Sequence, residues 1–175
     1  QFKAILLGGG PTTKELLKKS VERGIPIVSS YGMTETCAQI VTNSMATPSG
    51  IYTPLQSVGK PFPPNILQVR DERMKVLGKN ESGAIWLKGP QVFDGYYDKE
   101  HNDNRFDKKG WFNTGDFGHL NGFGQLFIES RREDLIITGG ENVNPTEVEQ
   151  AIQKIDSIKE VVVVGLPDDE WGQKV

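Results

Sequence analysis

Residues 29–36 combine side chains that can bind a nucleotide with a glycine that can turn the chain. The ring of Tyr31 can stack on a purine, and the hydroxyls of Thr34 and Thr36 can donate hydrogen bonds to a phosphate. The carboxylate of Glu35 offers the oxygen ligand that Mg²⁺ prefers. The same run can also be an ordinary helix start, with Thr34 as the N-cap and Glu35 favoured by the helix dipole. These residues alone favour neither interpretation.

Three consecutive glycines stand between an apolar run and Pro11. Gly8, Gly9 and Gly10 would let the backbone approach a ligand, and a helix beginning after Pro11 would favour an anion at its N-terminus. The loop could border a nucleotide or an acyl group, although a tight strand-to-helix turn is the commoner role of such glycines. A Walker phosphate loop is excluded because no Gly-Lys-Ser/Thr follows, and Thr13 occupies the last glycine position of a dinucleotide fingerprint.

A second group of candidate residues lies far along the chain, where Asp116 follows residues 111–115. A carboxylate held in place can accept hydrogen bonds from both hydroxyls of a ribose. A turn is the commoner setting for an aspartate beside glycine. Arg131 could donate to the same sugar or to a phosphate, but it lies in the charged stretch 130–134, where solvated side chains are usual.

The histidines and the cysteine do not suggest a metal centre or a nucleophile. His101 and His119 lie in polar, turn-rich contexts without the spacing of metal ligands, so we expect both to be structural. Cys37 has no histidine nearby in the sequence and is expected to be a small buried hydrophobe.

The elements that must position these residues begin with alternating strand and helix patterns. Residues 2–7 predict a buried strand, and residues 25–29 predict the next one. Between them, Thr12 and Glu15 have the spacing of a capping box and indicate a helix. Residues 34–41 predict a second, short helix. This alternation predicts parallel strands with ligands at their carboxyl ends.

The middle of the chain, residues 50–129, predicts a mostly β subdomain. Its many prolines and glycines break any helix, and residues 66–70, 84–87 and 126–129 have strand character. The dipeptide at Asn121 is Asn-Gly, which predicts a hairpin.

The last part, residues 135–175, predicts a small α/β region. Residues 135–138 have the character of a strand. Asn144 and Pro145 supply an N-cap and a first-turn proline for a helix. Residues 161–164 are a run of valines and predict a buried strand.

The expected fold class is therefore α/β, in the sense of mixed α+β. We expect residues 1–49 to end a large parallel-sheet domain and residues 135–175 to begin a small α/β domain that is truncated. Residues 50–129 form the β subdomain, and residues 130–134 link the last two parts. Both ends of the chain are expected to be cuts through a larger protein, although a processed, complete domain also fits.

Composition limits the functional classes. The chain has 175 residues, a net charge of -3 and a pI of about 5.5, so it has no basic excess for binding nucleic acid. One cysteine excludes an internal disulfide and fits a reducing compartment. No transmembrane segment is expected, because no apolar run approaches ~20 residues, and the first residues lack the layout of a signal peptide. We therefore expect a cytoplasmic protein.

Four segments, taken in order, resemble the superfamily of acyl-CoA synthetases, peptide-synthetase adenylation domains and luciferases, and they cover nearly the whole chain. Residues 31–36 are similar to its adenine and Mg²⁺ motif. Residues 83–96 resemble its G-E-L-x-I-x-G…G-Y segment, with Ala84 in place of Glu. Residues 112–116 resemble Y-x-T-G-D, with Phe in place of Tyr. Residues 131–149 resemble its motif G-R-x-x-D-x-I…G-G-E-N…E-I-E, with Ser130 in place of Gly and Val148 in place of Ile.

The resemblance implies a two-step reaction that uses ATP, Mg²⁺ and CoA. A small-molecule carboxylic acid attacks the α-phosphate of ATP and gives an acyl-adenylate and pyrophosphate. The thiol of CoA then displaces AMP and forms a thioester. Enzymes of this kind work mainly by positioning and by stabilising charge.

The resemblance also implies roles for individual residues, with Thr34 and Glu35 as the catalytic pair and Glu35 as the Mg²⁺ ligand. It implies that Gly139, Gly140 and Glu141 line the tunnel for the pantetheine arm of CoA. It places Glu133 at the hinge, where the family usually has Asp or Lys. The residues implied to bind ATP or AMP are Gly8, Gly9, Gly10, Ser30, Tyr31, Gly32, Met33, Thr34, Asp116 and Arg131.

The family's phosphate loop and its catalytic lysine would lie outside this chain, before residue 1 and after residue 175. We therefore expect the chain alone to bind AMP weakly or not at all and to catalyse no turnover. Within the superfamily, residues 31–37 and 167–173 are most similar to the 2-succinylbenzoate–CoA ligases of bacterial menaquinone synthesis. A ligase for another aryl or fatty acid and a non-catalytic nucleotide-binding module remain alternatives. A homo-oligomer is compatible with the sequence.

Overall fold

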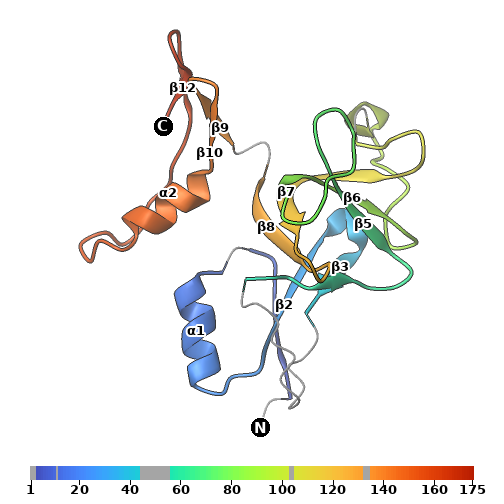
Figure 1. Ribbon diagram of the computed structural model, residues 1–175, viewed down its shortest axis with the longest axis horizontal. Helices are drawn as coiled ribbons and strands as arrows, with labels where there is room; N and C mark the ends of the chain where they lie inside the picture. The colour runs from blue at the N-terminus through green and yellow to red at the C-terminus, as the bar shows by residue number, and fades with distance from the viewer. Residues whose placement is uncertain (1–2, 11, 44–55, 103–104, 132–134) are drawn as a thin grey trace.

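The computed structural model describes residues 3–10, 12–43, 56–102, 105–131 and 135–175. The strands within them form three four-stranded sheets (Figure 1). Two of the sheets pack together, and the third, with helix α2, projects from them at the C-terminal end of the chain. Among the described residues, no helix has both the length and the apolar character that crossing a bilayer requires.

The first sheet has the order β1-β2-β3-β4 and contains the expected parallel pair. Strand β1 runs parallel to β2, with Ile5 opposite Ile27, whereas β3 and β4 pair antiparallel. The strands are β1 (Ile5–Leu7), β2 (Ile27–Met33), β3 (Ala38–Thr42) and β4 (Lys60–Pro61). The prediction of a buried first strand is wrong, because β1 is an edge strand of this sheet and Leu6 is exposed.

Helix α1 (Lys14–Glu22) connects β1 to β2 and begins one residue later than the predicted capping box. The N-cap is Thr13, whose Oγ1 accepts a hydrogen bond from the backbone N–H of Leu16 over 3.3 Å. Thr12 therefore does not cap the helix. Leu17 is the buried apolar side chain of α1.

The predicted helix over residues 34–41 is wrong. Only the 3-10 turn Thr34–Thr36 forms, and the chain then reverses through Cys37 and Ala38, whose φ angles are 52° and 100°. The buried hydroxyl of Thr36 donates to the carbonyl oxygen of Ala38 over 2.7 Å and accepts from the N–H of Met33. These bonds redirect the backbone into β3, antiparallel to β2. Cys37 is exposed rather than buried.

The second sheet is an antiparallel meander, and it contains the three runs expected to be strands in the middle of the chain. Its strands are β5 (Ile66–Arg70), β6 (Gly83–Lys88), β7 (Phe112–Leu120) and β8 (Leu126–Arg131). The predicted hairpin joins β7 to β8, where Asn121 and Gln125 are linked by a backbone hydrogen bond of 3.0 Å. A 3-10 helix (Lys99–Asn102) lies in the long connection before β7.

The core lies where these two sheets meet. Ile40 and Val41 of β3 pack with Ile85 and Leu87 of β6 and with Leu126 of β8, and all five side chains are fully buried. The backbone also joins the sheets, because Leu126 forms an isolated bridge with Gly59. This junction fixes β2 and β7 relative to each other.

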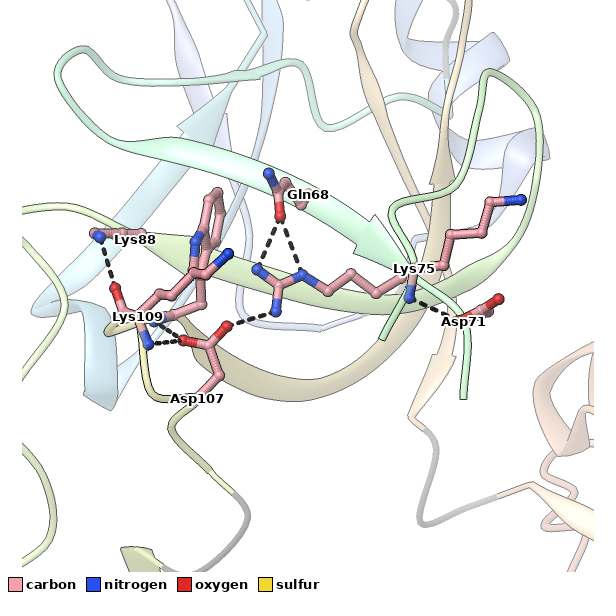
Figure 2. A network of polar contacts seen from close by, with 8 residues as sticks. Gln68, Asp71, Lys75, Lys88, Asp107 and Lys109 are labelled. Carbon is pink, nitrogen blue, oxygen red and sulfur yellow. Dashed lines mark hydrogen bonds and ion pairs between the residues drawn. The ribbon is translucent and has the colours of Figure 1, made fainter. Parts of the chain in front are cut away.

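An arginine anchors a polar network on the outer face of the second sheet, away from the core, and Figure 2 shows two of its partners, Gln68 and Asp107. Arg70 is 6% exposed, and its guanidinium lies 4.8 Å and 4.9 Å from the ring centroids of Trp86 and Trp111. It donates to Oδ2 of Asp107 over 2.7 Å and to the amide oxygen of Gln68. The contacts tie the connection that leads into β7 to strands β5 and β6.

The third sheet has the order β10-β9-β12-β11, and its strands are β9 (Ile136–Thr138), β10 (Glu141–Val143), β11 (Leu166–Asp168) and β12 (Gly172–Lys174). The predicted cap is confirmed, because the side chain of Asn144 accepts from the N–H of Thr146 at the start of α2 (Pro145–Ile152). The predicted buried strand at residues 161–164 is wrong. Val162 is exposed, and the N–H of Val163 donates to the Glu149 side chain instead of a strand.

Candidate functional site

A cleft with a volume of about 740 Å³ lies between the first two sheets and α2. One wall is the carboxyl end of β1 with β2, and the opposite wall is formed by β7 and β8. Helix α2 contributes Thr146 and Gln150. Seven of the residues implied to bind a nucleotide line this cleft: Gly9, Gly10, Ser30, Tyr31, Gly32, Met33 and Asp116.

The glycine loop is packed closely against β2. A Cβ atom at Gly8 would lie 2.6 Å from the hydroxyl of Ser30, so only glycine leaves that hydroxyl in place. The same hydroxyl donates to the carbonyl oxygen of Leu7 over 3.3 Å. Gly8 thus packs against Ser30 and does not line the cleft, whereas Gly9 and Gly10 do line it. These glycines follow the carboxyl end of β1, where ligands are expected to meet parallel strands, and that expectation stays a prediction.

Asp116 is the buried carboxylate of the cleft, with 5% of its surface exposed. It lies within β7, not in a turn, and its N–H donates to the hydroxyl of Thr114 over 3.1 Å. The phenol of Tyr31 donates to its Oδ2 over 2.5 Å. An ionised carboxylate oxygen can accept more than one hydrogen bond, which is the chemistry that binding a ribose requires.

Arg131 lies opposite Asp116 in the ladder between β7 and β8. The backbone of Arg131 therefore lies beside that of Asp116, in the neighbouring strand. Glu133, which the resemblance implies to be the hinge, lies outside the described residues.

Glu35 and Thr34 lie on the 3-10 turn directly after Met33, and they do not line the cleft itself. Oε1 of Glu35 accepts a hydrogen bond from the hydroxyl of Tyr96. The described residues contain no group of three or more His, Cys, Asp or Glu side chains placed to hold a metal. A lone carboxylate suits Mg²⁺ that arrives with a nucleotide, because Mg²⁺ is commonly held by one or two carboxylates, substrate phosphates and water.

The predicted CoA contacts are not brought to this cleft. Gly139 and Gly140 form the turn between β9 and β10, with φ angles of 57° and 85°, and Glu141 begins β10. The N–H of Gly139 donates to the carbonyl oxygen of Trp171 over 2.9 Å. These residues lie on the third sheet, away from β2 and β7 (Figure 1).

Sequence reasoning missed part of the cleft wall. His119 lines the cleft, where its Nδ1 lies 2.6 Å from Oε1 of Glu129 and its ring stacks on Phe127 at 4.9 Å. The Asn-Gly turn at Asn121 could have predicted this placement, because the register of that hairpin puts His119 opposite Phe127. Nothing in the sequence around Thr146 and Gln150 indicates that they line a cleft, because they reach it only through the placement of α2.

Comparison with known proteins decides the family. The model of the family described as AMP-binding enzyme matches residues 1–97. The chain belongs to the AMP-binding enzyme family. Its matched segment contains the glycine loop, β2 and the 3-10 turn that carries Glu35.

Two curated relatives of this AMP-binding enzyme chain share one name. A 2-succinylbenzoate–CoA ligase from Enterococcus faecalis is 42% identical over 171 residues, which cover 98% of this chain and 34% of that protein. One from Listeria monocytogenes is 44% identical, again over 171 residues and with 34% of that protein covered. The chain thus spans about a third of the length of the curated relatives it matches.

A solved structure shows the same architecture. The o-succinylbenzoate CoA synthetase from Bacillus subtilis, in complex with its acyl-adenylate intermediate, superposes with a TM-score of 0.87 at 42% identity. The match covers 98% of this chain and 34% of that chain. The mixed α/β fold expected from the sequence is therefore confirmed.

Proposed function

We propose that the protein containing this chain is an ATP-dependent acid–CoA ligase that acts on 2-succinylbenzoate. The observation that carries the proposal is the hydrogen bond between Tyr31 and Asp116 on opposite walls of the cleft. It joins the residue implied to bind adenine to the residue implied to bind ribose. Membership of the AMP-binding enzyme family supports the same assignment.

In the proposed site, the ring of Tyr31 stacks on the adenine of ATP. The carboxylate of Asp116 accepts hydrogen bonds from the ribose hydroxyls, with Arg131 as a donor from the neighbouring strand. Gly9 and Gly10 leave room for the groups attached to the α-phosphate. Together these contacts hold the α-phosphate where a substrate carboxylate can attack it.

The first half-reaction forms a bond between a carboxylate oxygen and the α-phosphorus and releases pyrophosphate. Mg²⁺, when bound, neutralises the charge of the phosphates. Glu35 is the residue we assign to hold it, and the hydroxyl of Thr34 contacts the α-phosphate from the same turn. In the second half-reaction the CoA sulfur forms a bond with the acyl carbon, and AMP and the thiol proton leave.

The second half-reaction is assigned to the C-terminal part of the chain. Gly139, Gly140 and Glu141 are proposed to line the path of the pantetheine arm, where small residues allow the arm to pass close to the backbone. Because they do not line the adenylate cleft, we propose that the third sheet moves relative to β7 between the steps. Glu133 is proposed as the hinge of that movement. An enzyme that uses ATP and CoA is expected to work in the cytoplasm.

The acid is proposed from the relatives, which share their name across several bacteria at 41% to 44% identity. The test is pyrophosphate release by the whole gene product that contains these 175 residues, over a panel of acids with ATP and Mg²⁺. Release that depends on 2-succinylbenzoate supports the proposal. Release with benzoates or fatty acids alone keeps the mechanism and removes this substrate, and no release with any acid favours a non-catalytic nucleotide-binding module.

A further inference from the structure

The hydroxyl of Tyr96 donates a hydrogen bond to Oε1 of Glu35 over 2.5 Å, between residues 61 positions apart. We propose that Tyr96 is a positioning residue, which holds the Glu35 carboxylate in the orientation that takes up the Mg²⁺ of an incoming nucleotide. The proposal rests on the proposed function, because it assumes that Mg²⁺-nucleotide binds at Glu35. Tyr96 itself touches neither the nucleotide nor the metal in this account.

The structure holds Tyr96 firmly at the point from which it reaches Glu35. The side chain of Asn102 clamps its backbone on both sides, since Oδ1 accepts from the N–H of Tyr96 over 2.7 Å and Nδ2 donates to its carbonyl oxygen over 3.1 Å. The ring packs edge-on against Phe93 at 4.9 Å and against His101 at 6.3 Å. The phenol is therefore directed by its neighbours rather than left to sample rotamers.

The loop that carries Tyr96 is also tied to the backbone of Glu35. The N–H of Phe93 donates to the carbonyl oxygen of Glu35 over 2.9 Å. Phe93 in turn packs edge-on against the buried ring of Phe112 at the start of β7. The turn that bears Glu35 is thus held by one main-chain bond and one side-chain bond, both from the same short loop.

This arrangement has a specific consequence for cation binding. A hydrogen bond to an ionised carboxylate is stronger than one between neutral groups, and the phenol takes one position on Oε1 while Oε2 keeps its acceptor capacity. Mg²⁺ demands near-ideal octahedral geometry and sheds water reluctantly. A carboxylate already fixed in one orientation therefore binds it with less loss of side-chain entropy than a freely rotating one.

The chain offers a matched pair of variants to test this role. Tyr96→Phe removes the hydroxyl and keeps the ring that packs on Phe93, whereas Tyr97→Phe makes the same change at the next residue, whose side chain is fully exposed. In the whole gene product, the Mg²⁺ concentration that half-saturates ATP binding is measured by titration, and the affinity for AMP is measured without metal. We expect Tyr96→Phe to raise the Mg²⁺ requirement by about tenfold and to leave AMP affinity unchanged.

A second variant tests whether the position of the Tyr96 phenol matters while its hydroxyl is still present. Asn102→Ala keeps the Tyr96 hydroxyl and removes the clamp on its backbone, so it should raise the Mg²⁺ requirement in the same direction but by less. The proposal is overturned if Tyr96→Phe and the native protein require the same Mg²⁺ concentration. It is also overturned if Tyr96→Phe loses as much affinity for AMP as it loses for Mg²⁺, because that result indicates a structural role. If the native protein binds neither AMP nor ATP, the proposed function fails first and this proposal falls with it.

Discussion

The phenol of Tyr31 and the carboxylate of Asp116 meet at 2.5 Å, although 85 positions separate them in the sequence. Tyr31 lies on β2 and Asp116 on β7, so the bond spans the two sheets that share the core. The core thereby decides the geometry of the cleft. Packing at Ile40 and Ile85 holds β3 and β6, the direct partners of those two strands, in place.

The first prediction concerns the carboxylate of that pair. Asp116→Asn replaces a charged acceptor by a neutral amide, and hydrogen bonds to charged groups are worth about 1.5–3 kcal/mol. We expect the affinity of the whole gene product for AMP to fall by about 10- to 100-fold in calorimetric titration. Asp94→Asn, at an exposed position outside the cleft, is the control and should bind as the native protein does. Equal affinities in all three proteins would remove Asp116 from the site.

The second prediction concerns the close approach of β2 and β3. A Cβ atom at Gly32 would lie 2.0 Å from the carbonyl oxygen of Ala38 and 2.5 Å from the Cα of Gln39. Neither backbone atom can move without breaking the pairing of the two strands. Gly32→Ala is therefore expected to destabilise the chain by about 3 kcal/mol or more in urea unfolding.

The control for Gly32→Ala is Gly122→Ala in the β7–β8 loop, where an added Cβ would have no neighbour within 4 Å. We expect this variant to unfold at the urea concentration of the native chain. A Gly32→Ala protein that is as stable as Gly122→Ala would contradict the packing of β2 against β3.

Local patterns predicted those elements whose signals lie within a few residues. The strand at Ile66–Arg70 and the helix capped by Asn144 formed where the sequence placed them. The hairpin at Asn121 also formed. The cap and the hairpin rest on turn and cap chemistry, which acts over neighbouring residues and needs no distant partner.

The failures share a physical cause, which is tertiary contact overriding local pattern. Residues 34–41 have helical spacing, but the hydroxyl of Thr36 bonds to the backbone on both sides of it and turns the chain into β3. Residues 161–164 have strand character, yet Glu149 of α2 takes the N–H of Val163. Asp116 was identified by resemblance, whereas its placement inside β7 depends on pairing with Arg131 across the sheet.

The third prediction concerns the arginine that anchors the outer face of the second sheet. Removing Arg70 takes away the hydrogen-bonded partner of the partly exposed Asp107 carboxylate, and hydrogen bonds to charged groups are worth about 1.5–3 kcal/mol. Arg70→Ala also deletes the cation between Trp86 and Trp111. We expect its urea midpoint to fall well below that of Arg73→Ala, which changes an exposed arginine of the following turn. Similar urea midpoints for the two variants would show that the contacts of Arg70 contribute little to the stability of the folded chain.

The fourth prediction concerns pH. Burial alone would raise the pKa of Asp107, but hydrogen bonds from Arg70 and from the backbone of Trp111 and Lys109 hold that pKa below its usual value of 3.8. A carboxyl whose pKa is lower in the folded state adds stability above its unfolded pKa and loses it as the pH falls through the folded pKa. The stability advantage of the native chain over Asp107→Asn should therefore be constant near neutral pH and shrink below about pH 4.

Urea unfolding of both proteins between neutral pH and about pH 3 measures this difference. A gap that grows as the pH falls would have the wrong sign for a lowered pKa. A gap that stays level down to the lowest pH would mean that the Arg70 contact does not distinguish the ionised carboxyl from the neutral one.

The central claim is that the cleft between β2 and β7 holds the nucleotide, and a crystal structure of the whole gene product with AMP tests it most directly. We predict the adenine against the ring of Tyr31 and both ribose hydroxyls within hydrogen-bond distance of Asp116. AMP bound with its ribose away from Asp116, or at another part of the molecule, would contradict the account.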